Sequence, residues 1–343
     1  MHFLTRLSAA YSAGSDGILK HFSASDGKVL SKMAIPLKRS KIDPPAMLHC
    51  LNPQKLLLGC DSGALHIIDL DNGNLSERPS LTSFPHEDYV SGIVPLPPTI
   101  ESTSGFPKQW VSTGGSTLVI TDARSGIIAR SEDQDDELLC AVYVPGFGPK
   151  KNRANGVIAV GAGSGVVTLW DRGVWDDHHD RITVDSGRGG GESIDAMALI
   201  PDGLGLGGKK LVVAVGDGTI RGVDLTRRET MEHELMLRHD DQESIVVAVG
   251  FDPQGRLISA GGTSIKVWQL SKPEDRNSAI VELLSTESPG RAESGDDSES
   301  DNSSDDDQAQ KKRPAKTKRG KAGKRRKLDA YGHHGVLRFE GLE

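Results

Sequence analysis

Residues 239–270 read HDDQESIVVAVGFDPQGRLISAGGTSIKVWQL, and this stretch decides the fold. It contains three short runs rich in Val and Ile, and a turn with Gly lies between each run and the next. Short runs of β-branched residues favour strands, and Gly supplies the positive φ that tight hairpin turns require. The stretch therefore predicts three adjacent strands connected by short turns.

The same pattern recurs along the chain with a period of about 50 residues, which is typical of propellers. Each repeat has a small residue, then alternating apolar positions, then often Asp, and a second apolar run precedes it. Two such runs joined by Asp, Ser and Gly form a β-hairpin, so the hairpin is the repeat unit. The hairpins are marked by Gly17 (GILKHFS), Gly63 (GALHIID), Ser116 (STLVITD), Gly165 (GVVTLWD), Gly218 (GTIRGVD) and Thr263 (TSIKVWQ).

A third apolar segment lies upstream of most hairpins, as in residues 89–96 (YVSGIVPL) and 138–145 (LLCAVYVP). Three strands and a more divergent fourth make a four-stranded blade, which cannot bury both faces alone. No segment shows a sustained 3.6-residue apolar period, which argues against helices alternating with strands. The sequence therefore predicts an all-β propeller whose blades stack around an axis.

The stretch 239–270 resembles a complete WD40 repeat, with His239 at its opening, Ser259 on the middle strand and Trp268 on the last. In that family a His, a Ser, an Asp and a Trp form a hydrogen-bonded tetrad within each blade. The resemblance implies that His239, Ser259 and Trp268 form most of such a tetrad, although Gly or Thr occupies the Asp position. The other blades are degenerate and are expected to depend on apolar packing.

Two further motifs extend the resemblance over residues 1–285. Trp170-Asp171 resembles the pair that names the WD repeat, and His86 resembles a histidine that opens a repeat. The resemblance implies a propeller of the seven-bladed type, whereas six hairpins are visible. Because Tyr11 already belongs to a second strand, we expect the amino-terminal blade to be incomplete.

The composition changes sharply after residue 285. Residues 293–307 hold eight carboxylates and no base, and residues 311–327 hold eleven Lys or Arg and no acid. Such a segment cannot bury enough apolar surface to offset the entropy of ordering, so residues 286–330 are predicted to be a disordered tail. Residues 331–343 regain apolar side chains, which fits either a short linear motif or an unstructured end.

Two basic clusters in this tail are separated by ten residues, a spacing that resembles a bipartite nuclear localisation signal and implies an import receptor as a partner. A solvated charge run and a nonspecific RNA-binding arm are the alternatives. The clusters are Lys311, Lys312 and Arg313, and Lys324, Arg325, Arg326 and Lys327. Serines among the carboxylates are candidate phosphorylation sites that would tune exposure of the basic block, namely Ser298, Ser300, Ser303 and Ser304.

Motifs for catalysis, cofactors or metals are missing from the sequence. Cys50, Cys60 and Cys140 have spacings that match neither a disulfide framework nor a zinc site. The segment 176–180, DDHHD, is better interpreted as a polar loop than as a metal cluster, because adjacent side chains tend to point apart. No run of eighteen apolar residues occurs. We therefore expect no enzyme activity, cofactor, metal, membrane partner or small-molecule substrate.

The openings YSAGSDGILK and LLLGCDSGALHIIDL and the acidic then basic tail resemble the WD repeat-containing protein 55 family, including its fungal nucleolar Jip-type branch. This resemblance implies a scaffold in the nucleus and nucleolus that contacts proteins and functions in rRNA processing and ribosome biogenesis. A chromatin adaptor or ubiquitin-ligase substrate adaptor would use the same fold, and RNA binding through the tail is a further alternative. Residues 1–289 carry 28 bases and 37 acids, so RNA contact is expected of the tail alone.

Overall fold

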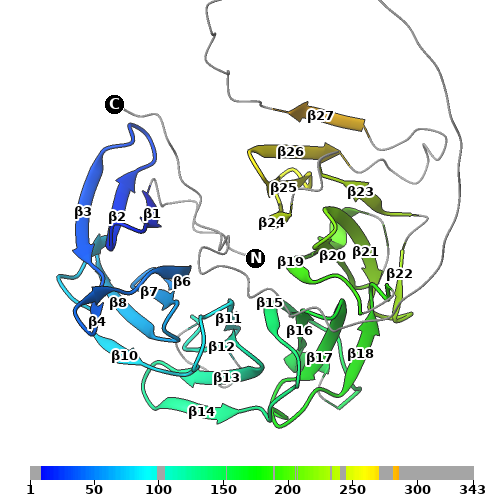
Figure 1. Cartoon of the computed structure of the whole chain (residues 1–343), viewed down its shortest axis with the longest axis horizontal. Coiled ribbons are helices and arrows are strands. Elements are labelled where there is room, and N and C mark those ends of the chain that lie inside the picture. Colours follow the sequence, from blue (N-terminus) through cyan, green and yellow to red (C-terminus); the bar gives the residue numbers. More distant parts are fainter. Residues whose placement is uncertain are drawn as a thin grey trace, which may run out of the picture. The chain divides into compact units, whose positions relative to one another are not determined.

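The computed structural model describes residues 9–98, 105–151, 153–187, 190–204, 206, 208–231, 234–239 and 245–269, and the backbone of residues 281–285. Its regular elements are strands, apart from two short 3₁₀ helices, Arg153–Asn155 and Asp202–Leu204. The strands form six antiparallel sheets of three to five strands, one for each predicted hairpin (Figure 1). The predicted all-β propeller is confirmed, with six blades described.

Each blade consists of strands that are consecutive in the chain. Blade 1 contains β1 (Ala9–Ala13), β2 (Ile18–Ser23) and β3 (Val29–Ala34). Blade 2 contains β6 (Pro45–Asn52), β7 (Lys55–Cys60), β8 (Leu65–Asp71), β9 (Asn74–Leu75) and β10 (Leu81–Ser83). Blade 3 contains β11 (Gly92–Leu96), β12 (Gln109–Gly114), β13 (Thr117–Asp122) and β14 (Gly126–Arg130). Blade 4 contains β15 (Leu138–Val144), β16 (Val157–Ala162), β17 (Val166–Asp171) and β18 (Asp180–Thr183). Blade 5 contains β19 (Ile194–Leu199), β20 (Lys210–Val215), β21 (Thr219–Asp224), β22 (Glu229–Thr230) and β23 (Met236–Arg238). Blade 6 contains β24 (Val246–Phe251), β25 (Leu257–Gly261), β26 (Ser264–Gln269) and β27 (Val281–Ser285).

A small hairpin of β4 (Leu37–Lys38) and β5 (Lys41–Ile42) connects blades 1 and 2. The first strands of blades 2 to 6 contact one another in chain order and lie innermost in Figure 1. Blade 1 has three strands, and Tyr11 lies on the first of them. Its β1–β2 hairpin corresponds to the second and third strands of the other blades, so no described strand of this blade has the innermost position.

Small residues allow the tight turn inside each hairpin. In blade 5, Gly218 has φ of 78°, a conformation that side chains with a Cβ rarely adopt. The Asp217 carboxylate accepts a hydrogen bond of 2.8 Å from the Thr219 backbone N–H, which fixes the same turn from the other side. The sequence pattern of a small or acidic residue before each third strand therefore has a local cause.

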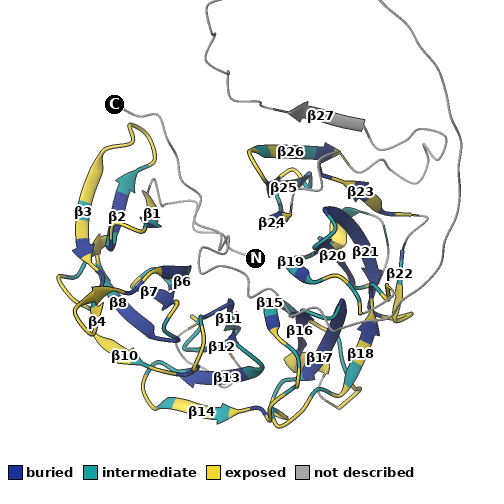
Figure 2. Ribbon diagram, in the orientation of Figure 1, coloured by how far each residue is buried: buried dark blue, intermediate teal, exposed yellow. Residues whose placement is uncertain are grey.

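The core consists of five apolar clusters among the described residues, and each lies between two successive blades. On β20, Leu211 and Val213 pack against blade 4, whereas Val212 and Ala214 pack against blade 6. Because successive side chains point to opposite faces, a strand between two neighbours is apolar along its whole length. This arrangement explains the continuous apolar runs in the sequence, and Figure 2 shows the buried central strands.

The two end blades are more exposed than the middle ones. All six residues of β16 are buried, whereas one residue of β26 is buried. On the outer faces of the end blades, Leu30 is 53% exposed and Ile265 is 42% exposed. None of the helices in the described part of the chain is long and apolar enough to cross a membrane.

Candidate functional site

The three residues predicted to form most of a tetrad in the last repeat meet in blade 6. His239 precedes β24, and its Nδ1 lies 2.7 Å from the Ser259 hydroxyl on β25. The indole N–H of Trp268 on β26 donates to the same hydroxyl over 2.8 Å. His239 and Ser259 are fully buried and Trp268 is 5% exposed, so this network connects the segment before the blade to its two central strands. Its bonds form away from water, where an unpaired polar group is costly.

His86 has the same position in blade 3. Its ring precedes β11 and is 3% exposed, with Nε2 2.9 Å from the Ser112 hydroxyl on β12 and Nδ1 3.4 Å from Thr117 Oγ1. Sequence reasoning selected His86 and missed Ser112. Aligning WVSTGG of blade 3 with LISAGG of blade 6 would have placed Ser112 over Ser259.

The Trp170-Asp171 pair lies at the end of β17, and its two side chains have different surroundings. Trp170 is fully buried, and its indole N–H donates to Thr168 Oγ1 over 3.0 Å. Asp171 Oδ1 lies 3.2 Å from Nδ1 of His179. The pair therefore forms no network with a His and a Ser of the kind seen among His239, Ser259 and Trp268 in blade 6, although Trp170 anchors the contact between blades 3 and 4.

A buried arginine joins blades 4 and 5, and sequence reasoning did not select it. Arg221 on β21 donates to the carboxylates of Asp185 and Asp217, each over 2.9 Å, and to the Val184 carbonyl over 3.1 Å. The backbone N–H of Glu192 and the Arg221 guanidinium hold the pKa of Asp185 below its ordinary value, against the opposing effect of burial. The arrangement is structural, because a buried charge needs paired partners.

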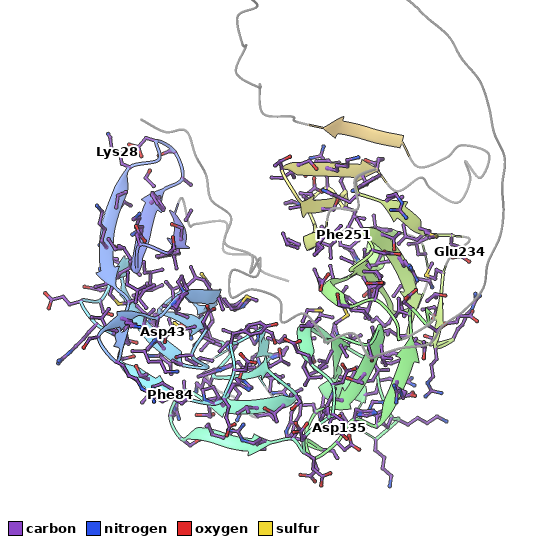
Figure 3. All side chains as sticks on the ribbon, in the orientation of Figure 1. Lys28, Asp43, Phe84, Asp135, Glu234 and Phe251 are labelled. Carbon is purple, nitrogen blue, oxygen red and sulfur yellow. The ribbon has the colours of Figure 1, made fainter. Side chains whose placement is uncertain are left out.

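The blade surfaces present side chains suited to protein contacts. Phe84 is 62% exposed at the periphery of blade 2 (Figure 3), and Phe106 is 52% exposed in the connection between β11 and β12 of blade 3. Phe106 lines a surface hollow together with prolines and residues of both charges. Aromatic and arginine side chains such as Phe106 and Arg172 are enriched at protein interfaces. The hollow is lined by Leu96, Pro97, Pro98, Phe106, Lys108, Gln109, Asp122 and Arg172.

The predicted tail sites lie outside the described residues. They are the basic clusters Lys311, Lys312, Arg313, Lys324, Arg325, Arg326 and Lys327, the serines Ser298, Ser300, Ser303 and Ser304, and the apolar segment 331–343. These remain predictions from the sequence.

Burial and, to a smaller extent, the charge of Arg130 lower the pKa of His86 to about 4 from its ordinary value of 6.5. Because the folded pKa is below the unfolded one, the unfolded chain takes up the proton first as the pH falls. The stabilising contribution of the neutral ring is therefore complete above about pH 6.5 and is lost progressively between pH 6.5 and about pH 4.

We expect the His86→Gln variant to lose part of this acid sensitivity, because its amide can reach Ser112 but does not titrate. In the native protein, this linkage should lower the free energy of unfolding by up to about 1.4 kcal/mol for each unit by which the pH falls within that window. Urea unfolding followed by circular dichroism at several pH values measures the difference. Identical pH slopes for the two proteins would show that His86 is not responsible.

Comparison with known proteins places this geometry in a family. No protein-family model matches the chain. The chain is 50% identical over 266 residues to "WD repeat-containing protein JIP5" of Phaeosphaeria nodorum, covering 76% of this chain and 62% of that protein. It is 51% identical over 265 residues to the jip5 protein of Botryotinia fuckeliana, covering 76% and 61%. It is 43% identical over 291 residues to the jip5 protein of Aspergillus terreus, covering 84% and 67%.

The chain thus spans 62% and 61% of the length of the first two of these relatives. Among solved structures, a chain in the "Crystal Structure of Mitotic Checkpoint Complex" superposes with a TM-score of 0.56 and 15% identity, covering 78% of this chain and 71% of that chain. At this identity the likeness shows the propeller fold alone. The predicted WD40 resemblance is confirmed, and identity of 43–51% over most of its length shows that the chain belongs to the JIP5 family of WD repeat-containing proteins.

Proposed function

We propose that this chain is a nuclear and nucleolar scaffold that brings proteins together during rRNA processing and ribosome biogenesis. The observation that carries the proposal is the 50% identity over 266 residues to a JIP5 protein. Membership in this family of WD-repeat proteins supports the prediction of a non-enzymatic protein that acts through protein contacts. The nucleolar role itself is proposed from the family resemblance of the hairpin openings and the charged tail.

The fold supports a scaffold in physical terms. Five apolar clusters fix the blades against one another, so the loops between strands are held on a rigid frame. Phe84 on blade 2 and Phe106 on blade 3 are each more than half exposed, so different blades present aromatic surface to partners. A frame of this kind lowers the entropy that a binding surface loses on association.

Affinity purification of the tagged full chain from nuclei, with and without RNase, tests the role. Proteins of pre-ribosomal particles should be enriched in both samples, since protein contacts survive RNase. Chromatin or ubiquitin-ligase subunits in their place would replace the proposal by one of the other adaptor functions. Loss of all partners after RNase would instead favour an RNA-binding arm.

Nuclear entry is expected to depend on the second basic cluster. Alanine at Lys324, Arg325, Arg326 and Lys327 should move a fluorescent fusion of the chain from the nucleus to the cytoplasm, because an import receptor reads two spaced groups of cations. Live-cell imaging of the nuclear-to-cytoplasmic ratio measures the effect.

The spacer between the clusters offers a matched control, since it also contains four bases. Alanine at Lys316, Lys318, Arg319 and Lys321 removes the same charge but leaves both clusters intact, so nuclear accumulation should persist. RNA binding in vitro should weaken equally in both variants, because each neutralises the same number of phosphates. Equal loss of nuclear accumulation in the two variants would contradict a bipartite signal.

A further inference from the structure

Three side chains of the types that bind metals, which come from three different segments of the chain, meet in blade 2. Asp43 lies in the segment that leads into the blade (Figure 3), Cys60 ends β7, and His66 lies on β8. One donor atom from each of the three residues lies within 4.8 Å of the other two. Their exposed fractions are 5%, 0% and 2%, so the cluster is sealed from solvent. Among the described residues, no other set of three His, Cys, Asp or Glu side chains comes together in this way.

The cluster occupies the part of blade 2 where blade 6 has its hydrogen-bonded network. The strand register places His66 opposite Leu58, just as it places Lys266 opposite Ser259. Because Leu58 has no hydroxyl group, the network of blade 6 cannot form here. Asp43, like His239, comes from the segment before the innermost strand of its blade.

His66 has an unsatisfied nitrogen in this cluster. Its Nδ1 lies 2.8 Å from the Thr82 hydroxyl on β10, while its Nε2 is buried and has no hydrogen-bond partner. When Nδ1–H donates to Thr82, Nε2 keeps a free lone pair. Metal-binding histidines commonly have this arrangement, because an oxygen acceptor on one nitrogen fixes the tautomer and orients the other toward the ion.

The remaining two ligands are positioned in a comparable way. The Asp43 carboxylate accepts hydrogen bonds from the Ser62 backbone N–H over 3.1 Å and from the Ser62 hydroxyl over 2.5 Å. Burial, followed by the charges of Asp43 and Asp61, raises the pKa of Cys60 to about 12, so the thiol keeps its proton in the absence of a cation. A cation placed between these groups would reverse that preference, because metal ions bind the thiolate.

We propose that Asp43, Cys60 and His66 bind a zinc ion through a carboxylate oxygen, Sγ and Nε2. Thiolate and imidazole together select zinc over the hard cations calcium and magnesium, which prefer oxygen ligands. Binding releases the Cys60 proton, and the thiolate and carboxylate then neutralise the two positive charges of the ion. A neutral complex fits a site from which water is excluded.

The three donor atoms must move slightly closer together to bind zinc. Zinc–ligand bonds of about 2.0–2.3 Å in a tetrahedron place the ligand atoms roughly 3.5 Å apart, whereas the three donors lie within 4.8 Å of one another, so they must approach by about 1.3 Å at most. The three side chains fill three of the four tetrahedral positions, and one water molecule enclosed with the ion would fill the fourth. Cys60 also belongs to the apolar cluster between blades 1 and 2, so the ion would fasten the segment before β6 to the frame of the propeller.

Metal analysis of the full chain tests the proposal. The chain, purified under reducing conditions and equilibrated with zinc, should retain one zinc ion per chain after removal of free metal, as measured by plasma mass spectrometry. With cobalt in place of zinc, it should show the thiolate-to-cobalt charge-transfer band. Cys60→Ala should lose both signals. Cys140→Ala is the matched control, because it removes another thiol, a partly buried one that donates to the Ile194 carbonyl, and should keep both.

Two further variants keep the test decisive if Cys60→Ala does not fold. Asp43→Asn preserves shape but removes the charge, and should lose zinc while its circular dichroism spectrum in chelator matches that of the native chain. Thr82→Val removes the acceptor behind His66 and should weaken zinc affinity by about 10- to 100-fold while one ion per chain still binds at high zinc. A native chain without bound zinc, or zinc retained in Cys60→Ala or Asp43→Asn, overturns the site.

Discussion

Replacement of Trp170 by Ala should lower the free energy of unfolding by about 3–5 kcal/mol. The indole is fully buried between blades 3 and 4, where it packs in one cluster with Val94, Leu118 and Ile158. Its removal leaves a cavity at a contact between two blades, and neither sheet can close that cavity without moving its neighbours. Thr168 also loses the N–H that donates to it.

Two variants separate the packing effect from other losses. Trp175 packs against the same cluster but is only half-buried, so Trp175→Ala should cost clearly less. Trp170→Phe keeps most of the apolar area and should recover much of the stability lost in the Ala variant. Urea unfolding followed by circular dichroism gives the three values. Equal costs for Trp170→Ala and Trp175→Ala would mean that the contact between the blades does not limit stability.

The second large effect is expected at Gly63, in the turn between β7 and β8. The residue has φ of +77°, and a Cβ added there would lie 2.0 Å from the backbone carbonyl oxygen of His86. Gly63→Ala therefore combines an unfavourable backbone conformation with a clash that only backbone movement relieves. We expect it to lower the free energy of unfolding by about 3 kcal/mol or more, because strain and overpacking each cost about 1–3 kcal/mol.

Gly126 provides the matched control. It has nearly the same φ, +79°, at the first position of β14, and nothing lies within 4 Å of an added Cβ. Gly126→Ala should therefore show the backbone cost alone, about 1–2 kcal/mol. The difference between the two variants isolates the contact between the turn of blade 2 and the segment that leads into blade 3. If urea unfolding gives equal losses, the contact at His86 contributes nothing measurable.

The hairpins and most first strands could be located from the sequence, because their signals are local. Gly and Asp residues before each third strand make the turns, and residues 138–145 already indicated β15. The strand β6 (Pro45–Asn52) was missed, since PAMLHCLN mixes apolar residues with His, Cys and Asn and begins with Pro. Its strand conformation is fixed by pairing with β7 and not by its own pattern.

The candidate site was predictable only where one repeat contained all its members. His239, Ser259 and Trp268 fall within a single blade, so their spacing indicated the network that the structure contains. Arg221 gave no signal, because one of its two carboxylate partners, Asp185, belongs to the preceding blade.

The sequence by itself determined the repeated β-hairpins, the all-β fold, the family resemblance and the separate charged tail, because turn chemistry and apolar alternation act between near neighbours in the chain. The tertiary structure alone decided which residues meet between and within blades. Examples are the packing of Trp170 between blades 3 and 4, the close approach of Gly63 to the backbone of His86, and the cluster of Asp43, Cys60 and His66. These contacts depend on how sheets stack and in which register their strands pair. Stacking and register bring together residues whose separation in the sequence carries no sign of their proximity.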